Sequence, residues 1–237
     1  MGSRRDRDPA RGRRSRPVRV GDPGVRAARQ GSASTFLEDG GARAVLILVR
    51  HGRTAANAAG LLQGRLDLAL DEVGHEQAGR IGALLREEPQ GTLRVVSSPL
   101  LRARQTASYV SDEVEVDERL QEIAYGEYEG RPLTDVSPSE WERWRADPHY
   151  APEGGESLAA LLARVRPALE ELAAQSVDRD IVVVSHVSPI KAAIAWALNV
   201  GIEISWRCQL DQASISRIAI SPRGPSLRTY NDTAHLG

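Results

Sequence analysis

The fold is decided by one stretch, residues 45–52, which reads VLILVRHG. Five apolar residues in succession are typical of a strand that is covered on both faces of a sheet. Two polar residues, Arg50 and His51, follow this run directly. Open α/β sheets bind their ligands beyond the carboxyl ends of the strands, so this pair is the first candidate for a functional site.

Apolar patterns elsewhere in the chain predict the remaining strands and the helices. Alternating Glu and Val at 113–116 predict a half-exposed edge strand. Three further strands are predicted from apolar residues at 93–96, 181–184 and 215–220. Stripes with helical spacing lie between the strands, at 78–85, 158–172 and 190–198. Strands that alternate with helices predict an α/β fold with a mostly parallel central sheet and helices on both faces.

The beginning of the chain differs from the rest in composition. Residues 1–30 hold ten Arg and three Asp, a net charge of +7, whereas residues 31–237 carry a net charge of −8. A stretch with so few large apolar side chains cannot offset the entropy lost on ordering. We therefore expect a disordered Arg-rich tail over residues 1–42 and one folded domain over 43–237. Only the tail has the charge of a nucleic-acid-binding segment, so we expect no nucleic-acid partner for the folded domain.

Cysteine content and hydropathy indicate the compartment. Cys208 is the one cysteine in the chain, so an internal disulfide is excluded, as suits a reducing cytoplasm. No run approaches the roughly 18 apolar residues of a membrane span, and no apolar stretch follows the first arginines as in a secretory signal. We expect a cytoplasmic protein without a membrane partner, and a homodimer remains open.

Polar side chains follow each of the three buried runs. Ser98 and Arg102 come after 93–96, and His186 comes after 181–184. With Arg50 and His51 they would place two guanidinium groups and two imidazoles at one sheet edge. Two guanidiniums favour a forked dianion, phosphate or carboxylate, and an imidazole nitrogen can attack phosphorus. The sequence has no Cys/His cluster and no dense Asp/Glu motif, so we expect no metal and no cofactor.

Five blocks in order resemble the histidine phosphatase superfamily, which also contains the cofactor-dependent phosphoglycerate mutases. The resemblance covers residues 45 to about 235. The family's "RHG" signature is matched by LVRHGRTAAN at 48–57, with Gln63 and Gly64 after it. The later blocks are SPLLRARQT at 98–106, LQE at 120–122, GGES at 154–157 and VSH at 184–186.

The resemblance implies a role for individual residues. His51 would attack phosphorus and carry the phosphoryl group, and Glu122 would protonate the leaving oxygen and then deprotonate water. The substrate would be held by Arg50, His51, Asn57, Gln63, Gly64, Arg102, Glu122, His186 and Val187. For Gln63, an alternative role is to cap a turn. For the acid, Glu118, Glu127 and Glu129 are alternatives to Glu122. The implied activity is hydrolysis of a small-molecule phosphate ester, with an optimum on the acidic side of neutral.

The sequence departs from the family pattern after His186. The segment HVSPIK at 186–191 lacks the usual small glycines, although Val187 could still offer its backbone N–H to phosphate near the start of a helix. This variant resembles an α-ribazole-phosphatase or acid-phosphatase branch. The tryptophan-rich interval at 141–145 resembles a small helical lid, where the mutases carry a longer insert. A phosphoglycerate mutase and a non-catalytic binding protein are the two alternatives.

Overall fold

The computed structural model describes residues 44–87, 93–176 and 179–237. The predicted disordered tail, residues 1–42, lies outside the described residues, and the domain boundary after it stays a prediction. The first strand begins at Ala44, close to the expected start of folded structure.

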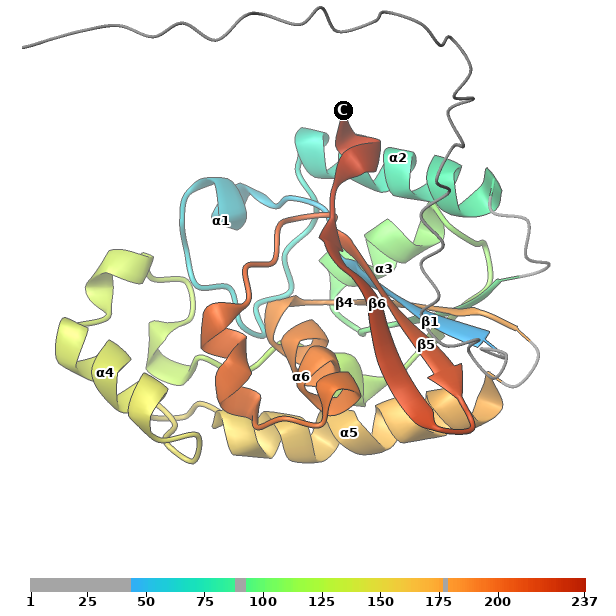
Figure 1. The fold of residues 1–237 in the computed structure, drawn as a ribbon. Helices are drawn as coiled ribbons and strands as arrows, with labels where there is room; N and C mark the ends of the chain where they lie inside the picture. Colours follow the sequence, from blue (N-terminus) through green and yellow to red (C-terminus); the bar gives the residue numbers. More distant parts are fainter. Residues whose placement is uncertain (1–43, 88–92, 177–178) are drawn as a thin grey trace, which may run out of the picture. The chain divides into compact units, whose positions relative to one another are not determined.

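A six-stranded sheet organises the described residues, and its strand order is β3-β2-β4-β1-β5-β6 (Figure 1). Strands β1 to β4 pair in parallel, whereas β5 and β6 add an antiparallel hairpin beside β1. The predicted mostly parallel sheet is confirmed. The strand bounds are β1 Ala44–Arg50, β2 Arg94–Ser97, β3 Val114–Val116, β4 Ile181–Ser185, β5 Ile215–Ser221 and β6 Gly224–Asp232.

The helices lie on both faces of the sheet, as expected. Their bounds are α1 Ala55–Ala58, α2 Glu72–Glu87, α3 Leu101–Ser108, α4 Pro138–Ala146, α5 Leu158–Gln175 and α6 Val187–Leu198. Short 3₁₀ helices connect them: η1 Glu118–Leu120, η2 Gly126–Tyr128, η3 Leu133–Asp135, η4 Ile202–Arg207 and η5 Ala234–Leu236.

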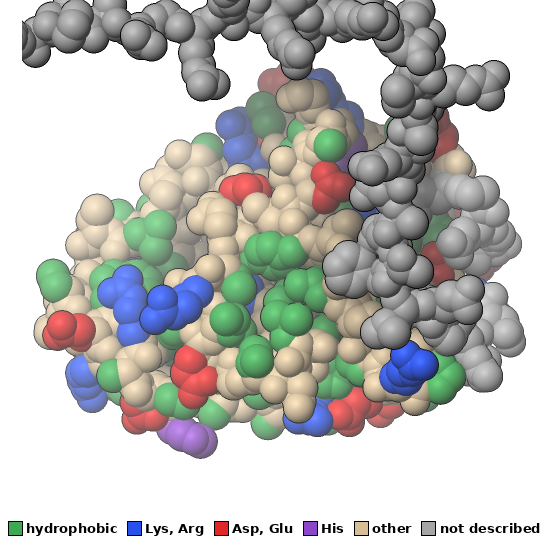
Figure 2. All heavy atoms as spheres, in the orientation of Figure 1, with side chains coloured by type: hydrophobic (Ala, Val, Ile, Leu, Met, Phe, Trp, Pro, Cys, Tyr) green, Lys and Arg blue, Asp and Glu red, His purple; other side chains and the backbone are tan. Residues whose placement is uncertain are grey.

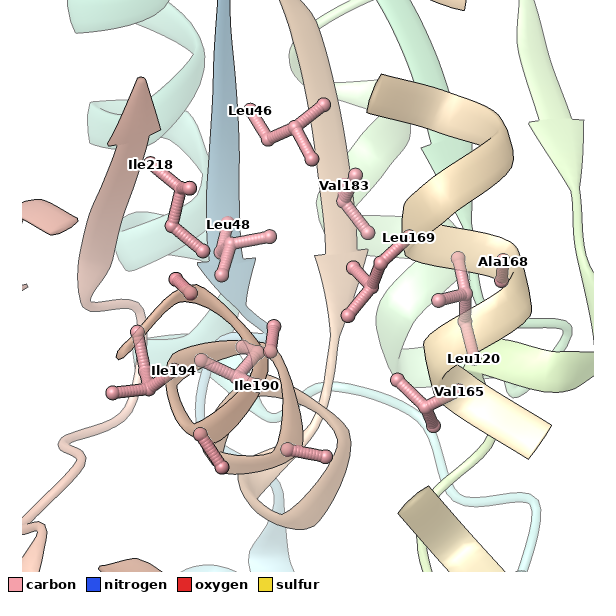
Figure 3. Close-up of a cluster of buried hydrophobic side chains, with 14 of the residues drawn as sticks. Leu46, Leu48, Leu120, Val165, Ala168, Leu169, Val183, Ile190, Ile194 and Ile218 are labelled. Carbon is pink, nitrogen blue, oxygen red and sulfur yellow. The ribbon is translucent and has the colours of Figure 1, made fainter. Parts of the chain in front are cut away.

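Side chains of the first strand alternate between two apolar cores. Leu46 and Leu48 enter the larger core, where they pack with α5 and α6 (Figure 3). Ile47 and Val49 point to the opposite face and pack with α2 and α3. Because successive side chains of a strand face opposite ways, only a strand covered on both faces needs an uninterrupted apolar run. This explains the sequence pattern at 45–49.

The two outer strands of the sheet differ in how easily the sequence reveals them. Strand β3 lies at one edge, and Val116 is 52% exposed, which confirms the predicted edge strand. Strand β6 lies at the other edge and was missed, because its side chains are mostly half-buried or exposed and lack an apolar run. It pairs with β5 through a turn in which Gly224 has a φ of 109°.

The carboxyl ends of β1, β2 and β4 meet at one edge of the sheet. Arg50 is in register with Ser185, and Ser97 is in register with Val184. The residues that follow these strands are therefore neighbours in space, as the sequence predicted. Among the described residues, no helix combines the length and apolar character needed to cross a bilayer.

Candidate active site

His51 lies at the centre of this edge and is 2% exposed. Its Nδ1 is 2.7 Å from the carbonyl oxygen of Gly52, which can only accept a hydrogen bond, so Nδ1 carries the proton and donates. The proton on Nδ1 leaves the lone pair of the imidazole on Nε2. Burial, then the charges of Arg102 and Arg50, hold the pKa of His51 well below its ordinary value. His51 is therefore a neutral imidazole whose lone pair lies on Nε2, where it accepts a hydrogen bond from Nε of Arg102.

Gly52 allows the backbone beside His51 to pack without a side chain. A Cβ at this position would collide with the backbone carbonyl of Gly74. The N–H of Gly52 donates to the hydroxyl of Thr106 on α3, over 3.1 Å. The backbone at this glycine thus approaches a neighbouring segment closely, and the approach fixes the carbonyl that orients His51.

Arg102 is held beside His51 by two backbone carbonyls. Its Nη1 and Nη2 donate to the oxygens of Leu66 and Gly64, each over 2.7 Å. Its Nε donates to Nε2 of His51 over 3.3 Å. The side chain is 1% exposed, and burial lowers the pKa of its guanidinium. Neighbouring Arg104 is exposed on the same helix.

His186 contacts His51 directly. The two ring centroids are 5.0 Å apart, and the rings are inclined at 59°. Nε2 of His186 is 2.7 Å from the hydroxyl of Ser98, which follows β2. Burial, followed by the charge of Arg102, holds the pKa of His186 well below its ordinary value. Ser98 thus fixes the ring, and within the described chain the other nitrogen, Nδ1, has no hydrogen-bond partner.

Arg50 brings the second guanidinium to the site. Its Nη1 donates to the carbonyl oxygen of Leu210 over 2.6 Å, whereas its buried Nε has no partner among the described residues. Burial lowers the pKa of Arg50. Buried polar groups are rarely left without a partner. Nε of Arg50 and Nδ1 of His186 are therefore the two nitrogens that could bind an oxyanion at this edge.

Glu122 lies at the start of α6, where it accepts three backbone hydrogen bonds. Oε1 accepts from the N–H groups of Ile123 and Ser188, and Oε2 accepts from the N–H of Val187. This differs from the expectation that Val187 offers its N–H to phosphate. The N–H groups of Val187 and Ser188 at the start of α6 are therefore occupied by the carboxyl group of Glu122.

Asn57 and Gln63 are linked through Thr54. The Thr54 hydroxyl lies 3.1 Å from Oδ1 of Asn57 and 2.9 Å from Oε1 of Gln63. Thr54 also caps α1, whose third residue is Asn57. Because both amide oxygens face Thr54, both amide NH₂ groups are turned the other way. Gln63 therefore bonds to the capping residue of α1 and also lines the pocket, and its contact with substrate stays a prediction.

A pocket of about 290 Å³ unites these side chains. Of the predicted site residues, those that line it are Arg50, His51, Asn57, Gln63, Gly64, Arg102, Glu122 and Val187. His186 is absent from the lining and reaches the site through its contact with His51. Glu118, Glu127 and Glu129 do not line the pocket, which leaves Glu122 as the acid in place among the four.

Several lining residues were missed by sequence reasoning, above all Lys191 and Tyr125. Lys191 lies one helical turn after Val187 on α6, so helical spacing from Val187 could have found it. Tyr125 lies three residues after Glu122 in a segment without regular structure, which carries no such signal. Within the described residues, no group of three His, Cys, Asp or Glu side chains is placed to hold a metal ion.

Comparison with known proteins places the chain in a family. Residues 46–233 match the model of the histidine phosphatase superfamily (branch 1). Phosphoserine phosphatase 1 of Hydrogenobacter thermophilus is 36% identical over 200 residues, which cover 81% of this chain and 94% of the relative. "Probable phosphoglycerate mutase GpmB" of Yersinia enterocolitica is 33% identical over 205 residues, covering 81% of this chain and 94% of the relative.

A solved structure agrees with these relatives. A mutant of phosphoserine phosphatase from Entamoeba histolytica, in complex with phosphoserine, superposes with a TM-score of 0.75 at 28% identity. The match covers 82% of this chain and all of the solved one. Fold and motifs agree over nearly all of the described residues, and the family supports a phosphatase enzyme. The chain belongs to the histidine phosphatase superfamily, branch 1.

Proposed function

We propose that this phosphatase hydrolyses small phosphorylated metabolites through a phosphohistidine formed at Nε2 of His51. The observation that carries the proposal is the neutral, oriented imidazole between two buried guanidiniums at the end of β1. Phosphoryl transfer requires mainly in-line positioning and stabilisation of charge on the phosphoryl oxygens. The site supplies both with its own side chains.

In the first step, the substrate phosphate is held by Arg50, Arg102 and His186, with the amide NH₂ groups of Asn57 and Gln63 beside it. Nε2 of His51 attacks phosphorus, and the bond between phosphorus and the ester oxygen breaks. Glu122 gives its proton to the leaving oxygen, which departs as an alcohol. The Gly52 carbonyl stabilises the proton that stays on Nδ1 of His51.

In the second step, water completes the reaction. Glu122, now ionised, takes a proton from the water as its oxygen attacks the phosphoryl group. The bond between nitrogen and phosphorus breaks, and inorganic phosphate leaves. Because Glu122 must carry a proton at the start, we expect activity to fall on the alkaline side. Val187 would serve as a phosphate donor only after Glu122 leaves the start of α6.

The same proposal includes metal independence and a cytoplasmic location. The two arginines supply the positive charge that a metal supplies in many other phosphatases. Hydrolysis of p-nitrophenyl phosphate between about pH 5 and 8, with and without excess EDTA, tests this part. We expect equal rates in both conditions. A rate that disappears on chelation would refute metal independence.

A phosphoglycerate mutase is the second candidate, because one relative bears that name. In that reaction a second hydroxyl of the substrate would take the phosphoryl group from His51 in place of water. Interconversion of 3- and 2-phosphoglycerate, stimulated by the bisphosphate, would establish it. We expect release of inorganic phosphate and no such interconversion.

A further inference from the structure

A second pocket, of about 130 Å³, adjoins the catalytic pocket. The two are continuous, because five residues line both: Leu62, Tyr125, Leu133, Val187 and Lys191. A molecule bound through its phosphate at His51 has this space beside its leaving group. We call it the tryptophan pocket, after Trp141, Trp144 and Trp206 in its wall.

Its wall is formed by aromatic rings from two separate segments. Trp141 and Trp144 come from α4 and stack with centroids 5.5 Å apart. Trp206 comes from η4 and meets Trp141 edge to face at 6.1 Å. Ile123 and Leu158 add further apolar side chains to a lining whose polar members are Ser188, Lys191 and Ser205. Such a wall favours an apolar ligand over a charged one.

Arg145 makes cation–π contacts with two of the rings in this wall. The guanidinium of Arg145 lies 5.8 Å from the ring centre of Trp141 and 5.7 Å from that of Trp206. Cation–π contacts of this kind hold the two rings together across the gap between α4 and η4. Figure 2 shows hydrophobic and basic side chains next to each other over this part of the surface. The pocket therefore has a preformed shape, which limits the entropy lost when it binds a ligand.

The volume of the pocket limits what it holds. An engineered cavity of about 150 Å³ with apolar walls binds one benzene molecule. At about 130 Å³, and open toward the catalytic pocket, the tryptophan pocket has room for one six-membered ring. Aromatic side chains also prefer flat rings, through offset stacking and edge-to-face contacts.

We propose that the preferred substrates are phosphate monoesters whose alcohol carries one flat apolar ring, bound in the tryptophan pocket. This inference rests on the proposed phosphatase activity. It distinguishes the chain from relatives named for phosphoserine, whose leaving group would bring a carboxylate and an ammonium into a mostly apolar pocket in which Lys191 is the charged lining residue. Binding energy from the ring would be used to position the phosphate at His51.

Two alkyl esters test the proposal without changing the chemistry of the leaving group. The wild-type protein is assayed with 2-phenylethyl phosphate and with ethyl phosphate, which both release a primary alcohol. We expect a kcat/KM for the phenylethyl ester at least about tenfold higher, from burial of the ring. Equal values for the two esters would overturn the ring proposal.

Tryptophan variants locate the preference in the pocket. Trp141→Ala and Trp206→Ala should lower the ratio of the two kcat/KM values severalfold, while ethyl phosphate hydrolysis persists. Trp196→Ala is the matched control, because Trp196 lies on α6, packs against the larger core and does not line the pocket. It should leave the ratio unchanged. A preference that survives both pocket variants would contradict the assignment.

The outcomes separate this inference from the function on which it rests. A protein that hydrolyses neither ester, nor p-nitrophenyl phosphate, contradicts the phosphatase proposal itself. A protein that hydrolyses phosphoserine with a higher kcat/KM than 2-phenylethyl phosphate keeps the phosphatase function and refutes the ring. In that case Lys191, the cation that borders both pockets, becomes the candidate for binding the substrate carboxylate.

Discussion

The two ends of the active-site region are built in different ways. At the phosphate end, Arg50 ends β1, and His51 and His186 directly follow β1 and β4. A hydrogen bond with a backbone or side-chain group holds each one. At the leaving-group end, the wall comes from α4 and η4, and Trp206 is 36% exposed. The residues at the strand ends would carry out the phosphoryl transfer, whereas the surrounding helices would determine which leaving group binds. Mutations at the two ends should therefore have different signatures.

The largest effect is expected from His51→Ala. Loss of the nucleophile should lower kcat by on the order of 10⁴-fold or more for every ester, whatever its leaving group. Steady-state assays with ethyl and 2-phenylethyl phosphate measure this. The matched control is His75→Ala, since His75 binds Tyr109, the residue after α3, and lies outside the pocket. Considerable activity in the His51 variant would show that another group attacks phosphorus.

Removal of Arg102 should have the next largest effect. Arg102→Ala deletes one of two buried guanidiniums at the phosphate, and we expect a loss of about 10²–10³-fold in kcat. The loss should be equal for the two esters, because Arg102 lines the catalytic pocket and not the tryptophan pocket. Arg104→Ala, on the exposed side of the same helix, should retain full activity. A loss confined to one ester would break the division between the two ends.

A smaller effect is expected from Ser98→Ala. The hydroxyl holds His186, which contacts His51, so its removal should loosen the ring and cost about tenfold in kcat. Ser98 touches neither pocket wall, and KM should change less than kcat. Ser98→Thr retains a hydroxyl and should restore part of the rate. An unchanged kcat in Ser98→Ala would show that His186 needs no support at Nε2.

The smallest effect is expected on the pH dependence of the free energy of unfolding. His51 and His186 have folded-state pKa values well below their ordinary ones, so the unfolded chain binds more protons just below about pH 6.5. Their contribution to the free energy of unfolding is complete above that pH. It is lost as the pH falls toward the folded pKa values, by up to about 1.4 kcal/mol per pH unit for each ring.

Urea unfolding of wild type and His51→Asn at several pH values measures this contribution. On acidification, the free energy of unfolding should fall less steeply in the variant than in wild type. The difference should equal the contribution of one histidine. His149→Asn, which changes an exposed residue, serves as the control. Identical pH dependence in wild type and His51→Asn would contradict a neutral, buried His51.

The sequence allowed the phosphate end to be predicted almost completely. Uninterrupted apolar runs locate buried strands, and parallel strands carry whatever follows them to one edge, so Arg50 and His51 could be placed from their positions alone. Glu122 came from the family resemblance. Its contacts with the N–H groups of Val187 and Ser188 could not be predicted, because they depend on where the loop after η1 meets α6.

The leaving-group end was much harder to predict. The sequence indicated a helical lid near Trp141, but Trp206 lies 65 positions away in a segment without a regular pattern. Its contact with Trp141 is a tertiary packing contact that local periodicity does not encode. The family pattern gives no signal for Lys191, because its segment departs from that pattern; only its helical spacing from Val187 indicates a place at the pocket. The edge strand β6 was missed because it lacks an apolar run.

The central claim is a phosphoryl group carried on Nε2 of His51, and trapping this intermediate tests it most directly. The protein is mixed with excess p-nitrophenyl phosphate, quenched rapidly in alkali, digested and analysed by mass spectrometry. We predict that the peptide containing His51 gains the mass of one phosphoryl group, and that brief treatment with acid removes it. A label on a different residue, or an unlabelled peptide while p-nitrophenol is released in a burst, would contradict the account.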